Sequence, residues 1–259
     1  MERLRCELTD GLARITLVAP DCGNAIDPEW ARQFRDAAHG LHNRDDLRVV
    51  LLSAQGNAFC VGGDLRYFAS VDDPYAALHE LAADLHDGML VLSELDAPLV
   101  ASVQGVAAGA GMSLVLAADL AIAARSASFT MAYTGVGFSP DGGSSYWLPR
   151  LVGHRRAKEL MLTNRRLSAA EAAELGVVTE VVDDDALAPR TAELAAHLAA
   201  GPTSSFGAVK RLLAAGELTP YREQLADEAE NIARSGASAN GREGVAAFVE
   251  KRRPQFVAR

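Results

Sequence analysis

The chain carries FCVGGDL at residues 59–65 and GVAAGAGMS at residues 105–113, and these two glycine-rich stretches decide the fold. Each follows a strand-like run and leads into a helix-like one. Small residues at such a junction let a ligand approach the backbone, and the amides of a helix start point at negative charge. Two converging amides form an oxyanion hole, in which one well-aimed donor contributes about 3–4 kcal/mol of transition-state stabilisation.

The composition is that of an ordinary globular protein. With 259 residues, 49% of them hydrophobic, the chain can bury one large core, with or without an appendage. Its net charge of −9 argues against nucleic acid or an anionic membrane surface as the main partner, because both need a broad basic face. An anionic ligand would need a local basic patch instead.

Cysteine usage and the N-terminus predict a cytoplasmic protein. Cys6, Cys22 and Cys60 lie far apart without metal-ligand spacing, so we expect free thiols in a reducing compartment and no metal site. The first residues are charged, and no apolar signal region follows them. The uncharged stretch from Ala97 to Ala118 reaches the length of a membrane span, but a proline and three glycines interrupt it. We therefore expect a buried strand, turn and helix in series, and no membrane partner.

Strand and helix signals alternate along most of the chain. Asp10-Gly11 joins two predicted strands, Arg5–Leu8 and Leu12–Val18, and a helix pattern follows Pro28. The order predicts an α/β core of repeated strand–strand–helix units. Further predicted elements are buried strands at Val49–Ser53 and Leu99–Val103, which deliver the two glycine loops, a strand at Ser128–Met131, helices at Arg155–Leu162 and Ala169–Leu175, and an edge strand after Gly176.

The last quarter of the chain differs in composition. From about Pro189, Ala, Glu, Leu and Arg dominate, and helical periodicity runs nearly to Gln255. We therefore expect a core over residues 1–188 and a helical region over residues 189–259. Such a region needs a surface to cover its apolar side, either its own core or a neighbouring subunit.

Several motifs are distributed along essentially the whole length. They are Asn24-Ala25-Ile26, the two glycine loops, Ala117-Ala118-Asp119, LPRLVG at residues 148–153, Ala172-x-x-Leu-Gly-Val-Val, and REGVxAF at residues 242–248. In this order and spacing they resemble the crotonase (enoyl-CoA hydratase/isomerase) superfamily. The resemblance implies an α/β crotonase (ClpP-like) spiral of strand–strand–helix units with a C-terminal helical trimerisation region, in a homotrimer or dimer of trimers.

The resemblance also implies the chemistry of the site. A coenzyme A thioester would bind with its carbonyl oxygen between the backbone amides of Gly63 and Ala110, which stabilise an enolate-like intermediate. Coenzyme A enters as part of the substrate, and no separate cofactor is expected. Ala110 stands where the family usually has glycine, a mild departure because the donor is backbone. The other expected substrate-binding residues are Ala25, Cys60, Gly62, Asp64, Leu65, Arg66, Gly109, Ser113, Tyr133 and Pro140.

The two water-activating glutamates of the family's hydratases fall at Ser113 and Tyr133. Serine does not take a proton at neutral pH unaided, and a tyrosine, which ordinarily releases its proton near pH 10, is a poor base at pH 7. Efficient hydration by the two-glutamate mechanism is therefore not expected.

One carboxylate falls at a catalytic position. Asp141, at the start of a predicted helix, matches an aspartate that moves protons in dienoyl-CoA and epoxyphenylacetyl-CoA isomerases and is the nucleophile of 4-chlorobenzoyl-CoA dehalogenase. Aspartate before Gly-Gly-Ser is also typical of a helix cap or turn. Asp64 and Asp119 are interpreted as structural, with Asp64 capping the helix behind the first loop.

Among these relatives the chain is most similar to the 2-(1,2-epoxy-1,2-dihydrophenyl)acetyl-CoA isomerases. The shared features are PDGG at residues 140–143, WLPR at residues 147–150, the aromatic Tyr133 and the run from Gly241 to Phe256. The dehalogenase is a weaker match, because its tryptophan falls at Tyr133 and its histidine cannot be assigned. His79 and His86 lie in the relevant region, but they are predicted to be surface residues of an amphipathic helix.

We therefore expect an acyl-CoA isomerase in which Asp141 shuttles a proton and the segment Tyr67–Leu92, with Tyr133 and Pro140, shapes an acyl pocket. Arg66 is expected to contact the nucleotide phosphates, with Lys251–Arg253 as a helper. Two other classes stay open. A residual hydratase, or a thioesterase or dehalogenase-type hydrolase, would need a bound water, and a non-catalytic CoA-binding protein would bind ligand without turnover.

Overall fold

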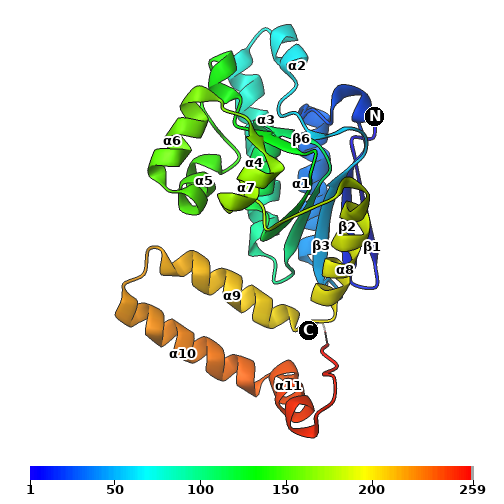
Figure 1. The fold of residues 1–259 in the computed structure, drawn as a ribbon, viewed down its shortest axis with the longest axis vertical. Coiled ribbons are helices and arrows are strands. Elements are labelled where there is room, and N and C mark those ends of the chain that lie inside the picture. Colours follow the sequence, from blue (N-terminus) through cyan, green and yellow to red (C-terminus); the bar gives the residue numbers. More distant parts are fainter. Residues whose placement is uncertain (258–259) are drawn as a thin grey trace.

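The computed structural model describes residues 1–257. It has two β-sheets, helices around them, and a helical arm that leaves the core (Figure 1). The strands are β1 (Leu4–Thr9), β2 (Leu12–Leu17), β3 (Val49–Ala54), β4 (Ala58–Cys60), β5 (Leu99–Val103), β6 (Val106–Ala108), β7 (Leu120–Ala124), β8 (Ser128–Thr130), β9 (Leu167–Ser168) and β10 (Glu180–Val182).

The helices lie between and after these strands. They are α1 (Pro28–His42), α2 (Leu65–Ser70), α3 (Pro74–Glu94), α4 (Ala110–Ala117), α5 (Ser144–Val152), α6 (His154–Thr163), α7 (Ala169–Glu174), α8 (Leu187–Ala199), α9 (Thr203–Gly216), α10 (Tyr221–Ala237) and α11 (Ala239–Glu250). Short 3-10 helices are η1 (Pro20–Cys22), η2 (Tyr133–Val136) and η3 (Asp184–Ala186).

The N-terminal hairpin forms where Asp10-Gly11 predicts it. Thr9 pairs with Leu12 in antiparallel register, so Asp10 and Gly11 alone form the turn between the strands. Their φ angles are 50° and 80°, the left-handed backbone that a two-residue hairpin turn requires. β1 is thereby an edge of the large sheet, whose strand order is β1-β2-β3-β5-β7-β10.

Three successive strand pairs step from the large sheet to the small one, whose order is β4-β6-β8-β9. β3 leads to β4, β5 to β6 and β7 to β8, and each new strand lies parallel to the corresponding strand of the pair before. This confirms the predicted strand–strand–helix repeat. The glycine loops, however, follow β4 and β6 rather than Val49–Ser53 and Leu99–Val103 directly. Gly56, with φ of +82°, and Gly105, packed against the Asn57 carbonyl, let the chain turn into the second strand of each pair.

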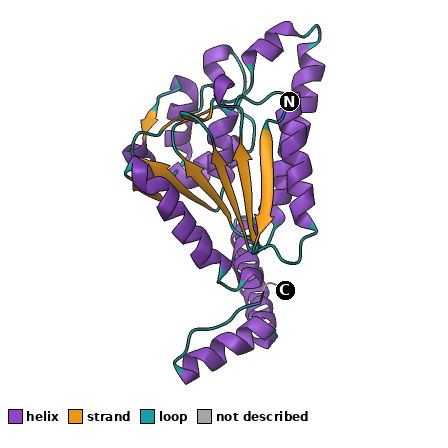
Figure 2. Ribbon diagram, turned by 90° about the vertical axis from the view of Figure 1, so that its right-hand side faces the viewer, coloured by secondary structure: helices purple, strands orange, loops and turns teal. Residues whose placement is uncertain are grey.

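The two faces of the large sheet are covered by different helices (Figure 2). Because side chains alternate along a strand, Val49 and Leu51 of β3 pack with Ala195 and Leu198 of α8. The intervening residues of β3 belong to the main core, together with aromatic and leucine side chains of α1 and α3. The main core therefore lies on the side of the large sheet that α1 and α3 cover. The glycine loops lie on this same side, next to α3.

The stretch from Ala97 to Ala118 contains β5, β6 and α4. This confirms the prediction of strand, turn and helix in series. None of the helices within residues 1–257 is long and apolar enough to cross a membrane. The later predictions also hold, because α6 and α7 cover the predicted helices and β10 is the edge strand after Gly176.

The C-terminal arm is attached to the core through α9. Lys210 forms an ion pair with Asp119 at 2.9 Å, and Arg211 forms one with Asp96 at 2.5 Å. Asp119 also accepts a hydrogen bond from the Leu99 amide at 2.7 Å, which is the structural role predicted for it. The expected boundary at residues 188 and 189 falls at the start of α8, which packs on the large sheet, so the part that leaves the core begins with α9 (Figure 1).

Candidate active site

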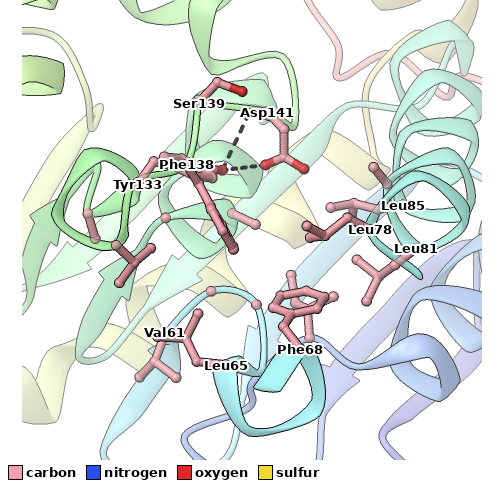
Figure 3. Close-up of a pocket in the computed structure, with 18 of the residues that line it drawn as sticks. Val61, Leu65, Phe68, Leu78, Leu81, Leu85, Tyr133, Phe138, Ser139 and Asp141 are labelled. Carbon is pink, nitrogen blue, oxygen red and sulfur yellow. Dashed lines mark hydrogen bonds between the residues drawn. The ribbon is translucent and has the colours of Figure 1, made fainter. Parts of the chain in front are cut away.

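A cavity of about 440 Å³ opens between the two glycine loops, α3 and the segment from η2 to Asp141. Its walls are mostly apolar. Phe68 and Phe138 meet edge to face across it, with ring centroids 6.1 Å apart. Figure 3 shows Val61, Leu65 and Phe68 on one side, Tyr133, Phe138 and Asp141 on the opposite side, and Leu78, Leu81 and Leu85 of α3 closing a third.

Two backbone amides at the edge of this cavity have no protein partner within residues 1–257. Ile26 donates to the Gly62 carbonyl at 2.8 Å and accepts from the Asp64 amide at 2.9 Å, so the Gly63 N–H points away from Ile26. Ala110 is the first residue of α4, where an N–H has no acceptor within the helix. Within residues 1–257 neither amide donates to another protein group, and both residues line the cavity.

The glycines bring these two amides together. Gly62 has φ of +93°, and a Cβ there would lie 2.9 Å from the Ala108 carbonyl oxygen. Gly111 packs against the Cys60 carbonyl with no room for a side chain. The loop after β4 and the start of α4 therefore touch through their backbones. Larger side chains at these positions would force the two amides apart.

Asp141 lines the same cavity as the two amides, and Figure 3 shows it on the side opposite Val61, Leu65 and Phe68. The Tyr133 hydroxyl donates to its Oδ1 at 2.6 Å. Its backbone carbonyl accepts from the Ser113 hydroxyl at 3.0 Å and from the Ser144 hydroxyl at 2.9 Å. The N-cap residue of α5 is Gly143, so the Asp141 carboxylate does not cap that helix. Asp141 therefore does not cap α5, but it does begin a turn, because its carbonyl accepts from the Ser144 amide at 3.2 Å. Asp64 does cap α2 by accepting from the Arg66 amide.

Ser113 and Tyr133 form hydrogen bonds with Asp141 and are not placed as bases. Ser113 is fully buried, and its Oγ lies 3.0 Å from the Tyr133 hydroxyl. Burial raises the pKa of Tyr133 above its ordinary value, and the neighbouring Asp141 charge raises it further. Tyr133 therefore stays protonated and donates a hydrogen bond at neutral pH.

His86 was missed as a site residue. Its Nε2 accepts a hydrogen bond from the Gly142 amide at 3.0 Å and lies 3.6 Å from Asp141 Oδ2. The prediction of a surface histidine is right in part, because half of the side chain is exposed. The available sequence signal was its place next to Leu85, on the α3 face that carries the pocket leucines. His79 instead stacks on Tyr75.

The predicted site residues divide into two groups. Gly62, Gly63, Leu65, Gly109, Ala110, Tyr133 and Asp141 line the cavity. Ala25, Cys60, Asp64, Arg66, Ser113 and Pro140 do not, so their contact with substrate stays a prediction. Cys60 and Ser113 lie fully buried behind the wall, and burial raises the pKa of the Cys60 thiol to about 12. The residues that sequence reasoning did not name individually include Phe68, Leu78, Leu81, Leu85 and Phe138.

The basic residues expected at the nucleotide phosphates are at the surface. Arg66 is exposed at the start of α2, one residue after Leu65 at the cavity mouth. In the tail, Arg252 is paired with Glu243 at 2.6 Å and with Glu250 at 2.6 Å. Of the two, Arg66 is the better placed to meet a ligand that extends out of the cavity.

Comparison with known proteins agrees with this fold. Residues 7–259 match the family model described as enoyl-CoA hydratase/isomerase. A protein of Rhodobacter capsulatus named probable enoyl-CoA hydratase is 40% identical over 99% of this chain and 98% of its own length. The 1,2-epoxyphenylacetyl-CoA isomerase of Escherichia coli is 37% identical over the full length of both chains. The crystal structure of an enoyl-CoA hydratase from a Polaromonas species superposes with a TM-score of 0.92 at 32% identity, covering 98% of this chain and 99% of that one. The chain belongs to the enoyl-CoA hydratase/isomerase family, the crotonases.

Proposed function

We propose that this protein is an acyl-CoA isomerase with Asp141 as its proton-transfer residue. The observation that carries the proposal is that one mostly apolar cavity is lined by Asp141 and by Gly63 and Ala110, whose amides donate to no other group within residues 1–257. Among the described residues that line the cavity, Asp141 is the only carboxylate. The resemblance to the isomerase relative from Escherichia coli points the same way.

The reaction needs one base and one charge-stabilising site. The Asp141 carboxylate would take a proton from the acyl group, and the electron pair left behind would move onto the thioester oxygen. The amides of Gly63 and Ala110 would hold that enolate oxygen, in a dry site where such donors are strongest. Asp141 would then return the proton at another carbon, so that a double bond shifts and no atom is gained or lost. No cofactor is proposed beyond the coenzyme A carried by the substrate.

A second candidate is hydration of an enoyl-CoA. It is favoured by the 40% identical relative that is named a probable hydratase. Ser113 and Tyr133 argue against the two-glutamate route, because Ser113 is buried and the Tyr133 hydroxyl donates a hydrogen bond to Asp141. Hydration would need water activated by Asp141 instead.

We also propose a trimer or a dimer of trimers in the cytoplasm. The arm from α9 to α11 exposes large apolar side chains, and α10 has no buried residue. A monomer would leave that surface in water, which soluble proteins rarely do over a large area. The exposed apolar residues of the arm are Val209, Leu213, Leu218, Tyr221, Leu225, Ile232, Val245, Phe248 and Val249.

The experiment that tests the function is a panel of acyl-CoA esters incubated with the full-length protein in heavy water. Mass spectrometry and NMR of the products would report double-bond position, deuterium uptake and added water. A shifted double bond without gain of water supports isomerisation. A 3-hydroxyacyl product would support hydration, and tight binding of every ester without any change would overturn both.

A further inference from the structure

The peptide group between Asp141 and Gly142 is anchored at both of its polar ends. Its carbonyl accepts from the hydroxyls of Ser113 and Ser144, and its N–H donates to His86 Nε2 at 3.0 Å. Gly142 has φ of +59°, in a region that few side-chain-bearing residues adopt. α3, α4 and α5 thus each supply one side chain that fixes the backbone carrying the Asp141 carboxylate.

The contact with Gly142 requires a neutral imidazole. A ring nitrogen accepts a hydrogen bond only through a free lone pair, and both ring nitrogens of a protonated histidine are donors. In the neutral form, Nε2 faces the Gly142 amide, and Asp141 Oδ2, 3.6 Å away, receives no proton from it. Oδ2 is then the free oxygen of the carboxylate, because Oδ1 is held by Tyr133.

Protonation would exchange these partners. Once Nε2 carries a proton from solvent, it no longer accepts from Gly142, and the nearest acceptor within the described site is Asp141 Oδ2. Both carboxylate oxygens would then be occupied, Oδ1 by Tyr133 and Oδ2 by His86. Oδ2, the oxygen otherwise open to substrate, would then accept a hydrogen bond from a charged donor, and a substrate proton would have to compete with that bond for the oxygen.

We propose that His86 is a proton-sensitive positioning residue, which holds the Asp141 base in place when neutral and blocks it when protonated. The inference rests on the proposed isomerase function for its effect on rate, but its structural part does not. Histidine is the side chain that ordinarily changes charge between pH 5 and 8, which sets the pH range of the test.

Asp141 is the charged group that faces His86. The other titratable groups on α3 and on the elements packed against it are as follows. On α1, Arg35 forms an ion pair with Asp84 at 2.5 Å, and His39 contacts Asp87 at 2.7 Å. α4 contains no titratable side chain. The remaining titratable residues of the packed elements are Glu29, Arg32, Asp36 and His42 on α1, Arg66 and Tyr67 on α2, Tyr133 on η2, and Tyr75, His79, Glu80 and Glu94 on α3 itself.

The kinetic test compares pH profiles between pH 5 and 8. In the wild type, kcat/KM is expected to fall tenfold per pH unit below the histidine titration. His86→Gln offers an amide oxygen to Gly142 and does not titrate, so its profile should stay flat where the wild type falls. His86→Leu removes the acceptor and should lower kcat about tenfold at pH 8, with KM within about twofold. His79→Gln, the same substitution on the same helix at a residue that stacks on Tyr75, should match the wild type.

The structural test needs no turnover. Labelling with carbonyl-¹³C aspartate and ¹⁵N glycine selects Asp-Gly pairs, which occur at residues 10–11, 87–88 and 141–142. Asp141→Asn removes the third signal and so assigns Gly142. The Gly142 amide should titrate with His86 in the wild type and in His79→Gln, and not in His86→Gln.

The two tests separate the possible failures. A Gly142 amide that titrates as expected in a protein without isomerase activity would leave the hydrogen-bond exchange standing and remove only the proposed function. Isomerase activity with superimposable profiles for wild type and His86→Gln, or a Gly142 amide that does not titrate, would overturn the role of His86.

Discussion

The Tyr133 hydroxyl donates a 2.6 Å hydrogen bond to Oδ1 of Asp141, at the position where hydratases of this family place a second glutamate. Tyr133 is therefore a hydrogen-bond donor that orients the Asp141 base, and it is not itself a base. Its pKa is raised by burial and by the charge it contacts, so the donor keeps its proton across the physiological range. This relationship distinguishes the site from a two-carboxylate one and leads to the first two predictions.

Asp141→Asn should abolish isomerisation while leaving binding of CoA esters nearly intact. The amide fills the same volume but cannot take a proton, and loss of a general base costs about 10²- to 10⁴-fold in rate. Steady-state rates and calorimetric binding of a substrate analogue would measure the two effects, with the exposed Asp45→Asn as control. More than about a third of wild-type activity in the Asn variant would show that Asp141 is not the base.

Tyr133→Phe should lower kcat about 10- to 100-fold, corresponding to the 1.5–3 kcal/mol of a hydrogen bond to a charged group. KM should change little, because the ring still lines the cavity. Ser113 still holds the Asp141 carbonyl, so the fold should survive. Equal rates for wild type and Phe variant would mean that the carboxylate is oriented without Tyr133.

Hydration of crotonyl-CoA by the wild type should be slow, well below the roughly 10 s⁻¹ of a typical enzyme. Restoring the glutamates with Ser113→Glu and Tyr133→Glu should lower the melting temperature by at least about 5 °C, because Ser113 is fully buried and the added charges lie together. Absorbance of the enoyl thioester and differential scanning calorimetry would measure these quantities. A fast wild-type hydration rate would overturn the interpretation of both positions.

Gly62→Ala should impair catalysis far more than its cost in stability explains. The left-handed backbone makes alanine unfavourable by about 1–2 kcal/mol, and the added Cβ would also meet the Ala108 carbonyl 2.9 Å away. Gly176 has a similar φ of +75° but nothing within 4 Å, so Gly176→Ala carries the backbone cost alone. Both variants should melt at lower temperature, and only Gly62→Ala should lose kcat. Loss of kcat in both would attribute the effect to general destabilisation.

Removal of residues from Pro202 onward should give an insoluble or dissociated protein with weakened CoA binding. The truncation deletes α9 and with it the ion pairs to Asp119 and Asp96 that cover the base of the core. Sedimentation of the full chain should give a trimer or hexamer. A monomeric full chain, or a truncated protein that remains trimeric and active, would contradict the proposed role of the arm.

The fold could be predicted largely from local signals, and the site only in part. Asp10-Gly11 and the two glycine loops determine backbone geometry within a few residues, so the hairpin and the loop contacts followed from sequence. The pairing of His86 with Gly142 joins residues 56 positions apart, and it depends on how α3 rotates against the loop before α5. No local pattern encodes that rotation. The same holds for the donor role of Tyr133, which sequence alone could identify only as an absent glutamate.

The exposed surface of α10 has a consequence for how stability should be understood in this protein. The helix has no buried residue within one chain, and most helical stability in proteins comes from packing of an apolar face. If neighbouring subunits cover it, its folding free energy becomes a function of protein concentration. Dilution would then destabilise the folded chain, and a melting temperature would be meaningful only together with the protein concentration at which it was measured.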